Sequence, residues 1–120
     1  MIVRYWTMQS ADIFKWLSAE RCRVMNLADF KSTLSDSAPP PDADAPLQAL
    51  WWAGRDDWEK AHTIVMDDEG IEAAWVHAYL HRVEGDLGNA GYWYRRAGRP
   101  VETSPLETEW AAIAQALLGR

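Results

Sequence analysis

Turn-forming residues divide the sequence after residue 46 into five short segments. The segments span residues 46–53, 56–66, 71–84, 87–97 and 105–118, and they are separated by glycine, proline or acidic turns. Within each segment, apolar residues recur at the three- and four-residue spacing of a helix, and no segment alternates like a strand. Proline suits the first turn of a helix, and glycine suits its end. The sequence therefore predicts an all-α domain over residues 47–120.

Two of these segments begin with the pattern of a capping box. Asp56 is followed three residues later by Glu59, and Ser104 by Glu107, with proline at the first helical position of the last segment. We therefore expect Asp56 and Ser104 to cap their helices. The last helix carries a continuous apolar stripe, formed by Leu106, Trp110, Ile113 and Leu117.

The first 46 residues differ from the rest in composition. Residues 1–34 form an N-terminal extension with one or two short helices, one over residues 10–22 and one that Asn26 would cap. Met25 is an alternative start, so residues 1–24 are an optional part of this extension. The run SDSAPPPDADAP (35–46) predicts an extended, proline-rich linker. We expect this linker to transmit no packing, and residues 1–45 to be dispensable for folding.

The helical segments pair into two similar hairpins. Gly85-Asp86 followed by Ala90, Tyr94 and Ala97 resembles the second half of a tetratricopeptide repeat, and Asp56-Asp57-Trp58 with Ala61 is a weaker copy 29 residues earlier. The resemblance implies a short right-handed array of two degenerate tetratricopeptide-like hairpins, with residues 105–118 as the capping helix.

A second resemblance covers most of the same region. The block HAYLHRVEGDLGNAGYWYRRAG (77–98), with DDWEKAH (56–62) upstream, is similar to a family of small microbial proteins that share it. The similarity extends over about residues 47–120. It implies a helical fold and this domain boundary, and it implies no reaction.

Charge and cysteine content restrict the classes of partner and compartment. The formal net charge is −6 and the isoelectric point is near 4.9, which argues against a nucleic-acid binder and gives no reason to expect an anionic membrane partner. Cys22 is the single cysteine, so no intrachain disulfide can form. The sequence shows neither a secretory signal nor a run of apolar residues long enough to span a bilayer. We expect a cytoplasmic protein.

One face of the third segment has the composition of a binding surface. Trp75, Tyr79 and Arg82 lie on the stripe that lines the concave groove of such repeats, and aromatic residues and arginine are enriched at binding hot spots. This row makes a protein- or peptide-binding module the leading functional hypothesis. The alternative is that the N-terminal helix or the C-terminal helix covers these side chains.

Another face of the same segment carries histidines. His77 and His81 are one helical turn apart, Glu84 lies on the same stripe, and His62 on the preceding helix is a third imidazole. These four residues are an alternative site for a divalent transition metal, and hence for a metal-dependent enzyme. The favoured interpretation is structural and needs no cofactor: His77 and His81 are buried and neutral between the third and fourth helices, bonded to Tyr94, a carbonyl or a water. The sequence identifies no catalytic residue.

Overall fold

The computed structural model describes residues 25–120, and every regular element within them is helical. The helices are α2 (Leu27–Ser32), the 3₁₀ turn η1 (Thr33–Ser35), α3 (Ala45–Gly54), α4 (Trp58–Val65), α5 (Ile71–Val83), α6 (Leu87–Arg96) and α7 (Leu106–Leu118). The all-α prediction is confirmed for this part of the chain. None of the described helices has the length and apolar content that a membrane crossing requires.

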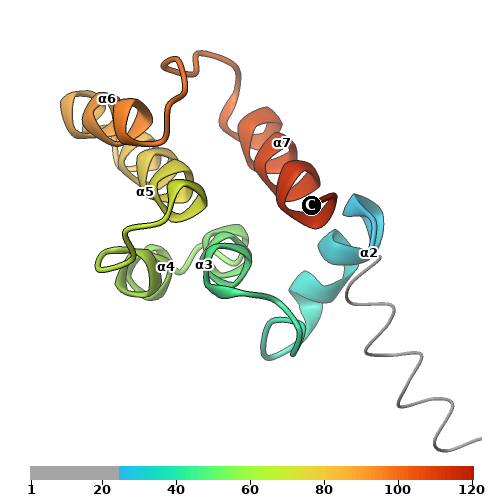
Figure 1. Ribbon diagram of the computed structural model, residues 1–120. Coiled ribbons are helices and arrows are strands. Elements are labelled where there is room, and N and C mark those ends of the chain that lie inside the picture. The colour runs from blue at the N-terminus through green and yellow to red at the C-terminus, as the bar shows by residue number, and fades with distance from the viewer. Residues whose placement is uncertain (1–24) are drawn as a thin grey trace, which may run out of the picture.

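Consecutive helices pack as two pairs, and α7 returns across them. Helix α3 packs against α4, and α5 packs against α6. After α6 the chain makes a long connection, and α7 then runs beside α5 and α3, with α2 next to its C-terminal end (Figure 1). The helix that ends the described chain therefore contacts both pairs and α2.

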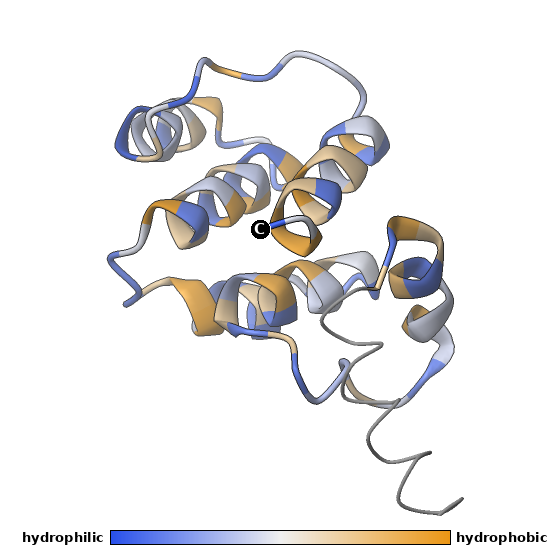
Figure 2. Ribbon diagram, turned by 45° about the vertical axis from the view of Figure 1, so that its right-hand side comes forward, coloured by the Kyte–Doolittle hydropathy of each residue, from blue (hydrophilic) through white to orange (hydrophobic). Residues whose placement is uncertain are grey.

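Helix α5 lies at the centre of this arrangement. Residues 73–81 of α5 are buried without interruption, so the helix is covered on every side rather than along one stripe. Helix α7 is coloured largely hydrophobic in Figure 2, whereas α6 is mostly hydrophilic or neutral. The core thus lies between α3, α5 and α7, and its small residues include Ala49, Ala78 and Ala114, each fully buried.

Two expected capping boxes do not form. Asp57, rather than Asp56, caps α4 by accepting a hydrogen bond from the backbone N–H of Lys60, and Asp56 has a left-handed backbone with φ of 62°. Helix α7 begins after Pro105 without a side-chain cap. Both predictions failed because the N-cap position of each helix lies one residue later than the capping-box motif places it. The expected cap of α2 is confirmed, since Asn26 accepts a bond of 2.8 Å from Asp29 N–H.

The segment before α3 packs on the helical array, contrary to our expectation. Phe30 of α2 is buried and its ring stacks on Trp110 of α7 with centroids 5.8 Å apart. Trp51 donates its indole N–H to the hydroxyl of Thr33, and Arg55 donates to the carbonyl of Leu34. Residues 25–45 therefore contribute contacts that a chain beginning at Pro46 would lose. The expected helix over residues 10–22 lies outside the described residues.

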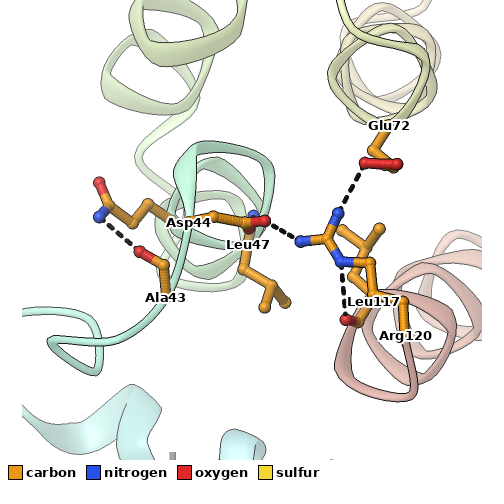
Figure 3. Close-up of polar contacts among 7 residues, drawn as sticks. Ala43, Asp44, Leu47, Glu72, Leu117 and Arg120 are labelled. Carbon is orange, nitrogen blue, oxygen red and sulfur yellow. Dashed lines mark hydrogen bonds and ion pairs between the residues drawn. The ribbon is translucent and has the colours of Figure 1, made fainter. Parts of the chain in front are cut away.

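Arg120 joins three parts of the array at one end of the bundle. Its guanidinium pairs with Asp44, the N-cap of α3, and with Glu72 in the first turn of α5, where the N···O distance is 2.6 Å (Figure 3). Its Nε also donates to the carbonyl of Leu117. The groups are largely solvated, so we expect the cluster to fix orientation more than to add stability.

A buried ion pair joins α5 to α7. Glu109 of α7 is 1% exposed, and its carboxylate accepts a bond of 2.8 Å from the guanidinium of Arg82 on α5. The same carboxylate accepts a bond of 2.5 Å from the hydroxyl of Tyr94 on α6. Burial, followed by the hydrogen bond to Glu109, raises the pKa of Tyr94 above its usual range, so this hydroxyl stays a donor. Arg82 also donates to the carbonyl of Ser104, just before α7.

Replacing Glu109 tests whether this ion pair holds α7 in place. We expect Glu109→Ala to lower the free energy of unfolding by about 1–3 kcal/mol, because the Tyr94 hydroxyl and the partly buried Arg82 guanidinium both lose their acceptor. Urea unfolding followed by circular dichroism measures the loss. The control is Thr108→Ala, which removes an exposed polar side chain from the same helix and should stay within about 0.5 kcal/mol of the parent. Equal effects of the two changes would contradict the role given to Glu109.

Candidate metal centre

Three histidines from two helices meet on one side of α5. His62 comes from α4, and His77 and His81 come from successive turns of α5. Each offers one ring nitrogen such that the three nitrogens lie within 4.8 Å of one another. His77 and His81 are buried and His62 is partly exposed, so the cluster opens to solvent on the α4 side.

The closest contact within the cluster joins the two helices directly. Nε2 of His62 and Nε2 of His77 are 3.0 Å apart, so one ring donates and the other accepts. A zinc ion bound at about 2.0–2.1 Å from each nitrogen of a tetrahedral site would place the nitrogens roughly 3.3 Å apart. The His62–His77 pair is therefore already near the spacing that a single ion imposes, and the nitrogen of His81 lies within 4.8 Å of both.

Two tryptophans flank the cluster. The indole of Trp58 stacks on His62 with centroids 4.6 Å apart, and the indole of Trp93 on α6 stacks on His77 at 3.9 Å. The indole N–H of Trp58 donates to the carbonyl of Leu80 and thereby fixes this ring. The two indole rings restrict the rotation of the His62 and His77 imidazoles and exclude water from their stacked faces.

Glu84 orients the third imidazole. Its carboxylate Oε1 lies 2.6 Å from Nδ1 of His81, an ion-pair and hydrogen-bond distance. Nδ1–H of His81 donates to this carboxylate, which leaves Nε2 with a free lone pair. A carboxylate behind a histidine is the usual outer partner of a metal-bound imidazole, since it fixes both ring tautomer and ring orientation.

The environment keeps two of the imidazoles neutral. Burial, and then the neighbouring His62 and His81, lowers the pKa of His77 to about 4. Burial and His81 also lower the pKa of His62, and Glu84 opposes this shift. Metal ions bind the neutral form of histidine, so these rings need no net deprotonation at pH 7. The ring that donates in the His62–His77 bond has to move its proton from Nε2 to Nδ1 before Nε2 can bind an ion.

The protein leaves one nitrogen of the cluster without a partner. Nδ1 of His77 is buried and has no hydrogen-bond partner among residues 25–120. Buried polar atoms nearly always have a partner.

The expected bond from these histidines to Tyr94 does not form, because the Tyr94 hydroxyl donates to Glu109 instead. His77 and His81 are buried as expected, but they pack against His62 and Trp93.

The row of Trp75, Tyr79 and Arg82 lies on the opposite side of α5, facing α7. The guanidinium of Arg99 lies 3.3 Å from the ring centroid of Trp75, and Arg82 is engaged by Glu109. Both aromatic side chains are buried, with Trp75 8% exposed and Tyr79 7% exposed. Tyr79 alone of the three also lines an open hollow.

This hollow is a groove beside α5 and α7. It consists of two adjoining cavities of about 270 and 340 Å³ that share Ala53, Asp56, Tyr79 and Glu107. We call it the α5–α7 groove. The remaining side chains that line it are Lys31, Leu34, Gly54, Trp58, Leu80, Val83, Leu106 and Trp110.

The sequence identified the histidines but not their surroundings. The spacing of His77 and His81 indicates a shared helix face, and His62 was named as a third imidazole on the preceding helix. The contributions of Trp58 and Trp93 were missed, because the flanking rings come from helices α4 and α6, whose rotation about their axes is set by packing. Glu84 was placed among the ligands, whereas its contact is with Nδ1 of His81.

Comparisons with protein-family models, with curated proteins and with solved structures gave no match to this chain. The resemblances described from the sequence therefore stay predictions. The candidate site is assessed on its own geometry.

The lowered pKa of His77 predicts how stability depends on pH in metal-free protein. An unfolded histidine takes up a proton near pH 6.5, whereas folded His77 does so only near pH 4. The unfolded state therefore binds more protons between these values, and the free energy of unfolding should fall as the pH falls from 6.5 to 4. Urea unfolding of the parent and of His77→Asn, in chelator, measures this dependence. We expect a shallower fall in the variant, and identical slopes would contradict a depressed pKa.

Proposed function

We propose that the protein binds a divalent transition-metal ion through His62, His77 and His81. The observation that carries the proposal is the convergence of three imidazole nitrogens within 4.8 Å. Glu84 supports it as the hydrogen-bond acceptor that orients His81. From the sequence, metal binding was the alternative to a purely structural role for these histidines. This proposal prefers metal binding.

The donor set favours particular ions. Imidazole nitrogens suit zinc, copper, nickel and iron, whereas magnesium and calcium require oxygen ligands. Three protein nitrogens leave one position of a tetrahedral ion for water or a substrate, which is the arrangement of catalytic rather than structural zinc sites. We therefore take Zn²⁺ as the reference ion.

We further propose that α3–α4 and α5–α6 are two degenerate tetratricopeptide-like hairpins with α7 as the capping helix. The pairing of consecutive helices supports this proposal, as do the buried small residues Ala61, Ala74, Ala78 and Ala90. Ala61 and Ala90 also carried the resemblance in the sequence.

Protein or peptide binding is a second candidate function. The α5–α7 groove favours it, because Tyr79 of the expected binding row lines this hollow. Arg82 is held by Glu109 and Trp75 is covered by Arg99, so we place peptide binding in the groove rather than along the whole row.

Zinc binding and its dependence on His62 test the proposed function. His62→Ala removes the hydrogen-bond partner of the buried Nε2 of His77, so in chelator it should lower the free energy of unfolding by about 1–3 kcal/mol. We expect Zn²⁺ at 100 times its Kd to stabilise the parent by about 2.7 kcal/mol. The variant should lose this stabilisation. Thermal unfolding of untagged protein, with zinc and with chelator, provides the measurement, together with metal analysis of the purified protein.

Two further variants separate a metal site from a packing role. Glu84→Ala should weaken zinc binding by about 10- to 100-fold, because His81 loses its orienting partner. The exposed Glu69→Ala is its matched control and should bind zinc like the parent. If zinc, nickel, copper and iron all fail to stabilise the parent, the metal proposal is wrong. Equal destabilisation of His62→Ala in zinc and in chelator would likewise favour packing alone.

A further inference from the structure

The α5–α7 groove combines acidic side chains with exposed apolar ones. Asp56 and Glu107 are exposed carboxylates where the two hollows adjoin. Val83 is 41% exposed and Leu106 39% exposed, and both line the same groove. A monomeric protein seldom exposes grouped large apolar residues without a role, so this surface is suited to a covering segment.

The electrostatics of the groove favour a positively charged occupant. Burial and the charges of Glu109, Asp56 and Glu107 raise the pKa of Tyr79 to about 12, with Arg82 opposing them. Three carboxylates, Glu109, Asp56 and Glu107, thus lie close enough to Tyr79 to contribute to this shift, against one guanidinium. Tyr79 and Trp110 also line the groove, with 7% and 6% of their surfaces exposed. Lys31 is the single basic side chain in its lining.

The chain itself contains a segment of matching chemistry. Residues 1–24 hold four of the 12 basic residues and two of the 18 acidic ones, which gives this segment a formal charge of +2 and leaves −8 on residues 25–120. Its basic residues are Arg4, Lys15, Arg21 and Arg23, and they are interleaved with apolar residues such as Ile13, Phe14 and Leu17.

The position of α2 brings this segment to the groove. Lys31 of α2 and Leu34 of η1 line one end of the groove, and residue 24 lies two residues before the N-cap of α2. A chain of 24 residues can extend to roughly 80 Å. Length therefore does not prevent residues 1–24 from following the groove to Val83.

We propose that residues 1–24 of this chain bind in the α5–α7 groove, with basic side chains at Asp56 and Glu107 and apolar side chains on Val83 and Leu106. The proposal deepens the peptide-binding function, because it names the segment that the groove takes. The sequence analysis named an N-terminal and a C-terminal segment as alternative covers for Tyr79, and this proposal chooses the N-terminal one. The metal site lies on the other side of α5 and shares Trp58 with the groove, because this indole lines the groove and stacks on His62.

A spin label in the N-terminal segment tests this contact in the full chain. Gln9→Cys with Cys22→Ser provides one cysteine for a nitroxide at residue 9, and the amide signals of nitrogen-15-labelled protein report on its distance. We expect the label to broaden the signals of Tyr79, Val83 and Glu107 more than those of the α4–α5 loop (66–70). Glu107→Lys should reduce this broadening, whereas Glu69→Lys, an equal charge change at an exposed site in that loop, should not. Raising the salt to about 1 M should also reduce it, because the Debye length falls to about 3 Å.

Two results would overturn the proposal. One is the absence of selective broadening at the groove in the full chain at low salt. The other is broadening that arises when spin-labelled chains without nitrogen-15 are mixed with unlabelled nitrogen-15 chains, because the occupant would then be the segment of a second copy. Zinc titration of Glu107→Lys gives an independent readout, which should match the parent. Failure of the docking proposal and failure of the metal proposal are thus separate outcomes.

Discussion

The buried carboxylate of Glu109 is the interaction on which the arrangement of the helices depends. It receives the guanidinium of Arg82 from α5 and the hydroxyl of Tyr94 from α6, and so fixes α7 against the second hairpin. An unpaired buried carboxylate would be costly, so the three groups have to meet for the fold to be stable. Phe30 stacks on Trp110 one residue further along α7, and α2 is thereby fixed to the same helix.

Helix α5 separates two surfaces with different chemistry. One side presents His77 and His81 to α4 and α6, and the other presents Tyr79 to α7 and the groove. Residues 73–81 are buried on every side of the helix. The histidines and Tyr79 therefore cannot turn toward solvent without disturbing the core. A rigid helix is a suitable support for metal ligands, since binding then requires little reorganisation of the first shell. The partly exposed His62 comes from the shorter α4 and is held by its stack on Trp58 and its bond to His77.

Local signals in the sequence were sufficient for the helices but not for their tertiary partners. Glycine and proline punctuation predicts α3 to α7, and Gly85 and Gly98 adopt the positive φ expected after helix ends. The capping boxes at Asp56 and Ser104 failed because a cap depends on backbone angles that a four-residue motif does not determine. The proline-rich stretch was expected to isolate α2, yet it returns the chain so that Phe30 reaches Trp110. His77 and His81 were found from their helical spacing, and His62 from its place on the preceding helix. The stacked tryptophans depend on the rotation of each helix about its axis, which sequence periodicity leaves undetermined.

X-ray absorption spectroscopy of protein loaded with one equivalent of zinc tests the metal assignment most directly. The account predicts nitrogen scatterers at about 2.0–2.1 Å with the multiple-scattering signature of three imidazoles. It also predicts that one imidazole is lost from this signature in His62→Ala. A first shell of oxygen ligands without imidazole, or a spectrum that is identical in the parent and in His62→Ala, would contradict it.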